Sequence, residues 1–344
     1  MITKDREKPL RLLAHEAAMR RVPKTHPKHP QIEQEFYRLH YGYKGEQAMD
    51  YYSSFLPHED YKVLHGLRIP DTKGRHFQMD SLLISPTHCL ILDSKYVSGK
   101  IEFDEDTGSL IRHNETGQER LGDPFAQLAR HKIQLSSIIE GLKLPQIPIY
   151  TQIVITHKNA TLLKKSPLIL KNVVFHTNLP TRIKEIDNTQ THTYFSNKDA
   201  NKLVKTLLKI HQDENFNLMN YYGFSSSSFI RGVICPICSH APMQKSYQKW
   251  LCLKCGHSEK ELLQQTIKDY PLLGFGNKIT NREFREFICL HSSHIAYREL
   301  LSLNIPHQGK KKPAYILLNK NTNDPREVRL PGAFNITSYT NHLK

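Results

Sequence analysis

Two closely spaced cysteine pairs constrain the fold of this chain more than any other feature of its sequence. They are Cys235 and Cys238, and Cys252 and Cys255, separated by 13 residues. Because the N-terminus lacks an apolar signal core, we expect reduced thiolates in a closed tetrahedral Zn²⁺ site rather than disulfides. The spacing therefore predicts a zinc ribbon with a structural metal, which presents Lys249 and Trp250 as nucleic-acid contacts.

A second feature, QMDSLLISPTHCLILDSK at residues 78–95, predicts a β-hairpin with an acidic end. Pro86 lies in the turn between two apolar runs, and the resulting pairing places Asp80 opposite Asp93. Opposed residues hold their Cβ atoms about 4.5–5.5 Å apart, so two carboxylates repel each other unless a positive charge lies between them. Lys95 follows two residues later on the same face.

The arrangement of Asp80, Asp93 and Lys95 is costly as structure alone. It suits a divalent cation, Mg²⁺ or Mn²⁺, that bridges two carboxylates beside a phosphate, with the lysine ammonium near the developing negative charge. A surface ion triplet at a sheet edge is the competing interpretation, and the spacing alone favours neither.

The excess of basic residues favours a polyanionic partner. Lys and Arg number 48 against 33 Asp and Glu, which gives the 344-residue chain a net charge of +15. Nucleic acid is the commonest such partner. Charge alone also allows a basic surface that binds nothing, or a weak association with acidic lipid. No apolar run approaches the ~18 residues that cross a bilayer, so we expect a soluble, cytoplasmic protein.

The length allows about two or three domains, and the pattern of strands and helices changes along the chain. Strand-like runs within residues 61–95 and 149–175 flank a helix that Asp123 caps and Pro124 begins. This order predicts an α/β fold with a mixed α+β sheet flanked by helices. The expected segments are a helical N-terminal extension (1–40), a larger domain (41–222), a serine-rich linker (223–230), the zinc ribbon (231–262) and a small C-terminal module (263–344).

The C-terminal module has the pattern of a small helical nucleic-acid-binding domain. Thr280 and Glu283 predict a capping box at the start of one helix, and a second helix is expected at residues 293–303. A basic loop and a β-rich run follow, so the segment fits either a winged helix-turn-helix or a helical pair packed on the zinc ribbon. The candidate contacts are Tyr297, Arg298, Lys310, Lys311 and Lys312.

Four blocks in chain order resemble the NERD family, the nuclease-related domain of bacterial proteins. They are GYKGE at 42–46, FQMD at 77–80, ILDSKYVSG at 91–99 and DPFAQLARHK at 123–132. The resemblance covers about residues 10–210 and implies a restriction-endonuclease-like core, related to the PD-(D/E)xK nucleases, for the larger domain.

The resemblance also implies roles for individual residues. Asp80 and Asp93 would be metal ligands, with Lys95 as the charged catalytic partner. Glu46, as a further Mg²⁺ ligand, and Gln127 would be accessory catalytic residues. The chain departs from the family by having Asp at position 93 and Tyr at position 96, where Glu and Asn are usual. The shorter Asp stem would move the carboxylate back from the metal by about one methylene.

The sequence thus predicts a Mg²⁺-dependent deoxyribonuclease with an appended zinc ribbon. An alternative from another class is a catalytically inactive DNA- or RNA-binding protein that uses the nuclease fold as a scaffold. A third hypothesis is an RNA-directed nuclease, since zinc ribbons contact RNA as well as DNA. One active site of this type cuts one strand, so double-strand cleavage would call for a homodimer or for two sequential nicks.

Overall fold

The computed structural model describes residues 2–56, 61–71, 73–115, 117–309 and 314–317. The chain divides into two compact units. Unit 1 comprises residues 1–12 and 35–214, and unit 2 comprises residues 13–34 and 215–344. Helices α1 (Leu10–Arg21) and α2 (His29–Ser53) each contribute residues to both units.

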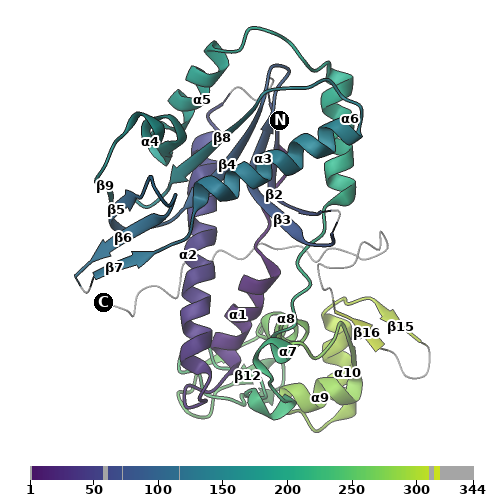
Figure 1. Ribbon diagram of the computed structural model, residues 1–344. Coiled ribbons are helices and arrows are strands. Elements are labelled where there is room, and N and C mark those ends of the chain that lie inside the picture. Colours follow the sequence, from purple (N-terminus) through teal and green to yellow (C-terminus); the bar gives the residue numbers. More distant parts are fainter. Residues whose placement is uncertain (1, 57–60, 72, 116, 310–313, 318–344) are drawn as a thin grey trace. The chain divides into compact units, whose positions relative to one another are not determined.

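A six-stranded mixed sheet forms the centre of unit 1 (Figure 1). In spatial order its strands are β1 (Ile2–Lys4), β2 (Lys62–Pro70), β3 (His76–Ile84), β4 (Cys89–Lys95), β8 (Ile149–Ile155) and β10 (Val173–Phe175). Strands β2, β3 and β4 form an antiparallel meander. In contrast, β1 pairs with β2, and β8 pairs with β4 and β10, in parallel. The predicted mixed α/β fold is confirmed.

The β3–β4 hairpin has the predicted register. Ser81 pairs with Leu92, and the turn closes through a hydrogen bond from the backbone N–H of Ser85 to the carbonyl oxygen of His88. Side chains alternate between the two faces of a sheet, so residues at even spacing along a strand share a face. The acidic residues at positions 80 and 93 therefore lie at the same end of the hairpin.

Two hydrophobic clusters cover the two faces of this sheet. On one face, Leu82 belongs to a cluster with residues of α3 (Pro124–Gly141) and α6 (Asn197–Ile210). On the other face, Leu83 belongs to a cluster with residues of α2 and α5 (Leu179–Asn188). The alternation of apolar residues along β3 thus places one helical layer on each face, as Figure 1 shows for α3 and α2.

Helix α3 begins as predicted. The Asp123 side chain accepts a hydrogen bond from the backbone N–H of Ala126 at 2.9 Å, and Pro124 occupies the first helical position. This cap satisfies one of the N–H groups that a helix start leaves without a partner. It fixes where the helix begins and therefore which of its residues face the sheet.

A second sheet in unit 1 contains a hairpin that follows the acidic segment. In spatial order its strands are β7 (Gly117–Arg120), β6 (Leu110–Asn114), β5 (Gly99–Phe103) and β9 (Ala160–Leu162). Helix α4 (Pro167–Asn172) and the 3₁₀ turn η1 (His176–Asn178) also belong to unit 1.

In unit 2, the cysteine pairs flank the strands of a small antiparallel sheet. Its strands are β11 (Gln244–Ser246), β12 (Lys249–Leu251) and β13 (Ser258–Glu259). Each Cys-x-x-Cys pair forms a tight turn, in which Ser239 N–H donates to the Cys235 carbonyl and Gly256 N–H to the Cys252 carbonyl. Gly256 has φ of +73°, the left-handed conformation that favours glycine, so the turn needs the residue that the sequence provides.

The C-terminal part of unit 2 has the element order of a winged helix-turn-helix. The elements are α8 (Leu263–Leu273), β14 (Lys278–Thr280), α9 (Asn281–Ile288), α10 (Ser293–Ser302), β15 (His307–Gln308) and β16 (Ala314–Ile316). The strands lie in the order β14, β16, β15. The capping box of Thr280 and Glu283 is present at the start of α9, as predicted.

Two expected segment boundaries fall elsewhere in the structure. The boundary after residue 40 lies within α2, and β1 of the proposed N-terminal extension joins the main sheet. The proposed linker at 223–230 follows α7 (Leu218–Tyr222) inside unit 2. There, Ser226–Ser228 form the 3₁₀ turn η2 and Phe229 is buried in the hydrophobic core. Within the described ranges, the helices are too short or too polar to cross a bilayer.

Candidate nuclease site and zinc site

Four predicted residues meet at the end of the β3–β4 hairpin. Asp80 lies on β3, Asp93 and Lys95 on β4, and Gln127 on the first turns of α3. Lys95 Nζ lies 2.6 Å from Asp93 Oδ2 and donates to Gln127 Oε1 at 3.2 Å, while Gln127 Nε2 donates to Asp93 Oδ1 at 3.1 Å. Asp80 Oδ2 accepts the backbone N–H of Ser94 at 2.8 Å. The structure therefore brings these four residues together.

The Asp93 carboxylate is the most deeply placed of this group. The residue is 3% exposed. Burial raises the pKa of Asp93 to about 6, the positive charge of Lys95 opposes the shift, and the negative charge of Asp80 adds to it. Two carboxylates this close together are stable in a buried position only when cations lie nearby. Lys95 supplies one such positive charge.

Glu46 reaches the site from α2 because a glycine lets that helix approach the sheet closely. A Cβ atom on Gly45 would lie 2.7 Å from Thr156 Oγ1 and 2.9 Å from the Cβ of Tyr96. The neighbouring ring of Tyr96 also stacks on Tyr41, with an interplanar angle of 3°. The GYKGE block thus places Glu46 by close packing of α2 against the ends of β4 and β8.

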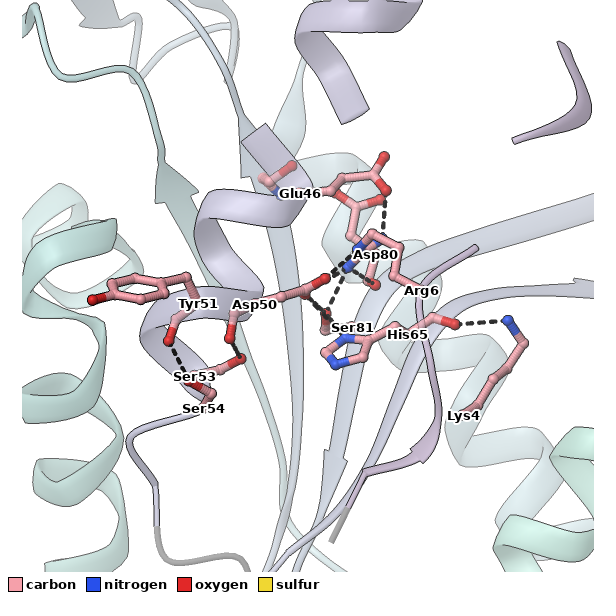
Figure 2. Close-up of polar contacts among 11 residues, drawn as sticks. Lys4, Arg6, Glu46, Asp50, Tyr51, Ser53, Ser54, His65, Asp80 and Ser81 are labelled. Carbon is pink, nitrogen blue, oxygen red and sulfur yellow. Dashed lines mark hydrogen bonds and ion pairs between the residues drawn. The ribbon is translucent and has the colours of Figure 1, made fainter. Parts of the chain in front are cut away.

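Arg6, which the sequence analysis did not single out, lies at the centre of the acidic residues (Figure 2). Its Nη1 donates to Glu46, while its Nε and Nη2 donate to the two carboxylate oxygens of Asp50 at 2.5 and 2.9 Å. Nη2 also donates to the carbonyl oxygen of Asp80 at 2.7 Å and to Ser81 Oγ at 3.0 Å. The Arg6 side chain is 5% exposed, so its guanidinium is buried with every nitrogen bonded.

The electrostatics around Arg6 show an excess of negative charge. Burial raises the pKa of Glu46 to about 8, with a further contribution from the charge of Asp80, and Arg6 only partly offsets both. For Asp50 the balance is reversed: burial raises its pKa, but hydrogen bonds from His65 and Arg6 outweigh burial and lower it. Asp50 was also missed from the sequence, although it lies one helical turn after Glu46.

His131, which shares a face of α3 with Gln127, is buried at 6% exposure and packs against Phe77 at a ring distance of 5.8 Å. Burial lowers its pKa, against a smaller opposing effect of Asp80. These contacts are those of a core histidine next to the site.

The four paired cysteines form a compact cluster in unit 2. Their sulfur atoms all lie within 4.8 Å of one another. Cys235 Sγ is 3.6 Å from Cys255 Sγ, and Cys238 Sγ is 3.5 Å from Cys252 Sγ. Tetrahedral Zn²⁺ with Zn–S bonds of about 2.3 Å requires sulfur separations of about 3.8 Å, so the cluster fits a zinc ion and leaves no open coordination position.

The predicted nucleic-acid contacts of unit 2 fall into three groups. Lys249, Tyr297 and Arg298 are exposed. Trp250 is only 1% exposed and lies in the hydrophobic core of the unit, so it has no free ring face on which a base could stack. The sequence could not distinguish the two faces of so short a strand. Residues 310–312, the three lysines, lie outside the described residues.

The zinc ribbon also packs on α10. Lys245 Nζ lies 2.8 Å from Glu299 Oε1 and 5.1 Å from the ring centre of Trp250. The helical pair thus contacts the zinc ribbon, and its elements follow one another in the order of a winged helix.

Comparison with known families supports the nuclease resemblance. Residues 41–156 match the family described as nuclease-related domain, NERD. The matched segment contains Glu46, the β3–β4 hairpin and Gln127, and it lies within a mixed α/β fold that carries further elements. Curated proteins and solved structures gave no match.

The nuclease relationship implies a divalent metal, and the donor set has the right chemistry for one. Asp80 and Asp93 offer carboxylate oxygens, the ligands that Mg²⁺ prefers, on adjacent strands. One carboxylate oxygen of Glu46, Oε2, is engaged by Arg6. In the part of the chain that the structure describes, only one group of three or more His, Cys, Asp or Glu residues has ligand atoms close enough to share an ion. That group is the cysteine quartet.

Proposed function

We propose that this protein is a metal-dependent nuclease that hydrolyses phosphodiester bonds in DNA. The observation that carries the proposal is the contact of Lys95 and Gln127 with Asp93, beside Asp80, inside a NERD domain. Such a buried group of opposing charges costs stability and is expected where chemistry requires it.

Each of these residues has a role that its contacts support. A divalent cation, Mg²⁺ or Mn²⁺, held by Asp80 and Asp93 would polarise the scissile phosphate and lower the pKa of a nearby water. Lys95 would place its ammonium beside the phosphoryl oxygens, where negative charge increases in the transition state. Gln127, bonded to both Asp93 and Lys95, would fix their orientation. Glu46, near Asp80, would add to the acidic field.

Two features favour a nucleic acid as the substrate, and duplex DNA in particular. The chain carries a net charge of +15, which attracts a polyanion. In unit 2, α10 presents the exposed Tyr297 and Arg298 from the position of a recognition helix in the winged helix-turn-helix order. We propose that this module and the exposed Lys249 bind DNA, with the zinc ribbon stabilising the module through its contact with α10.

A cleavage assay tests the proposal. Supercoiled plasmid and linear single- and double-stranded DNA are incubated with the zinc-loaded protein and Mg²⁺ or Mn²⁺. Asp80→Asn and Lys95→Ala are expected to lower the cleavage rate at least 100-fold. Asp106→Asn and Lys100→Ala, at exposed positions of the same unit, serve as matched controls and should cut at the wild-type rate. Folded Asp80→Asn protein that cuts as fast as wild type would refute the assignment.

A DNA- or RNA-binding protein without catalytic activity is the second candidate. It is favoured by the pairing of Glu46 with Arg6 and of Asp93 with Lys95, which already provides each carboxylate with a cation. Divalent-ion binding distinguishes the two: a nuclease should bind Mn²⁺ and lose it in Asp93→Asn, whereas the binding protein should retain DNA affinity and bind no Mn²⁺. Matched RNA substrates in the same cleavage assay test an RNA-directed nuclease.

A further inference from the structure

Arg6 lies outside the segment that matches the NERD family, yet it bonds to Glu46, to Asp50 and to the Asp80 carbonyl. It follows β1, whose parallel pairing with β2 fixes the N-terminal segment along the edge of the sheet. From there its guanidinium bonds to Glu46 and Asp50 on α2, and to Asp80 and Ser81 on β3. Figure 2 shows these contacts converging on one side chain.

The carboxylates of the site divide into two pairs. Asp80 and Asp93 lie beside α3: Gln127 of α3 donates to Asp93, and Asp80 accepts the backbone N–H of Ser94, the residue next to Asp93. Glu46 and Asp50 come from α2, which covers the opposite face, and both bond to Arg6. Ser81, one position along β3, points to that second face and also bonds to Arg6. Arg6 therefore accounts for the α2 pair and leaves the strand pair to another cation.

We propose that Arg6 is a positioning residue that engages the carboxylate of Glu46 and thereby limits the site to a single divalent ion, bound at Asp80 and Asp93. This inference rests on the proposed metal-dependent function and specifies its metal stoichiometry. The fixed guanidinium supplies the second positive charge at this site.

The chemistry of the guanidinium explains why it can exclude an ion. Two-metal sites place their ions about 3.5–4 Å apart and need carboxylates that reach both. Glu46 is the residue that could serve a second ion beside Asp80, and its Oε2 already accepts a hydrogen bond from Nη1 of Arg6. The planar fork also binds both oxygens of Asp50, which fixes the guanidinium in place. A second dication would then meet a permanent positive charge.

Mn²⁺ binding to the full-length, zinc-loaded protein tests this inference without relying on activity. Calorimetry and the electron paramagnetic resonance of free Mn²⁺ give the number of ions bound. Wild-type protein is expected to bind one Mn²⁺ per chain, and Arg6→Gln to bind two, or one about tenfold more tightly. Arg6→Lys keeps the charge and should still bind one ion, with affinity within about threefold of wild type. Arg75→Gln, at an exposed position of unit 1, is the matched control.

The outcomes separate this inference from the proposed function. Wild-type protein that binds two ions, or folded Arg6→Gln protein with wild-type stoichiometry and affinity, would overturn the role of Arg6 while leaving a metal-dependent nuclease in place. No Mn²⁺ binding by wild type would overturn the metal site itself. If Arg6→Gln fails to fold, the Arg6→Gln/Asp50→Asn variant removes one charge of each sign. This double variant also removes the bond between Arg6 and Glu46, so two bound ions are again expected. A single ion bound as in wild type would contradict the inference.

Discussion

Each unit buries an arginine against acidic residues, but the two arginines balance their charges differently. In unit 2, the Arg21 side chain is 1% exposed, and its Nε lies 2.8 Å from Asp269 Oδ2. Its Nη1 donates to the carbonyl oxygens of Ile230 and Gly232. Arg20 contacts the other oxygen of the same aspartate at 2.7 Å. In this region two cations share one acid, and backbone carbonyls provide the remaining acceptors.

In unit 1 the ratio of cations to acids is reversed, since Arg6 alone faces several acids. Burial lowers the pKa of Arg6, but the hydrogen bond with Asp50 and the charges of Glu46, Asp50 and Asp80 outweigh burial and leave it above its usual value. For Arg21, burial is the larger effect, and its pKa is lowered despite Asp269. A buried arginine alone therefore does not indicate function. The charge around each arginine distinguishes them, since Arg6 faces several acids whereas Arg20 and Arg21 share one.

The strongest test of this comparison replaces the acid partner of each arginine. Asp269→Asn leaves Arg21 buried without a counter-charge and is expected to cost about 4 kcal/mol of unfolding free energy. Asp50→Asn should cost about 1–2 kcal/mol, because Arg6 keeps Glu46 and the Asp80 carbonyl as acceptors.

Urea unfolding measures both losses. Trp250, the single tryptophan, lies in the core of unit 2 and reports on that unit by fluorescence, whereas hydrogen exchange of β3 and β4 peptides reports on unit 1. Equal losses in the two variants would show that the two arginines are equivalent structural residues and would remove the contrast.

A smaller change in the free energy of unfolding is expected from the close packing of α2 that places Glu46 beside Arg6. Gly45→Ala would place a methyl group 2.7 Å from Thr156 Oγ1, so α2 must shift, at a cost of about 1–3 kcal/mol. Gly42→Ala, one turn earlier, meets no atom within 4 Å and should instead stabilise the helix by about 0.5–1 kcal/mol.

Thermal unfolding followed by circular dichroism compares the two glycine variants, and Mn²⁺ titration shows whether a displaced Glu46 changes ion binding. A Gly45→Ala protein as stable as Gly42→Ala would mean that α2 does not depend on this close approach.

The smallest effect concerns a buried group that is close to neither arginine. His88, in the β3–β4 turn, is fully buried, and burial lowers its pKa against the weaker opposing charge of Asp187. Below pH 6.5, His88 is therefore protonated in the unfolded chain but still neutral in the folded protein. The free energy of unfolding falls with pH over this range, until the pH drops below the folded-state pKa.

This loss is at most about 1.4 kcal/mol per pH unit. His88→Gln should flatten the profile of urea unfolding between pH 7 and pH 5, and His192→Gln, at an exposed position, controls for the removal of a histidine. An unchanged slope in His88→Gln would assign the acid sensitivity to other groups, with the acidic cluster around Arg6 as the first to examine.

Local rules predicted a large part of this structure. The register of the β3–β4 hairpin, the cap of α3 by Asp123 and the capping box at Thr280 each depend on residues a few positions apart. The spacing of the cysteine pairs likewise predicted their clustering. These features were predictable because short-range sterics and hydrogen bonding determine them almost alone.

The remaining features depend on contacts between distant parts of the chain. Arg6 bonds to the Asp80 carbonyl across 74 positions, and nothing near Arg6 in the sequence indicates this contact. Asp50 did carry a signal, since it lies four residues after Glu46 on the same helix face. The burial of Trp250 and of Phe229 depends on which surfaces the core of unit 2 covers, which a short strand or a serine run does not reveal.

The hairpin that joins the two strand aspartates also sets an order of assembly. Asp80 and Asp93 come together when a short turn closes, an event of microseconds for an isolated hairpin. Arg6 must first bring a much longer loop together, and long-range closure is slower. During folding, the strand aspartates therefore meet before Arg6 arrives, and Lys95, carried on the same strand, is the cation at hand. If the metal site has the proposed function, a divalent ion present at that stage would stabilise the acidic end of the hairpin while it folds.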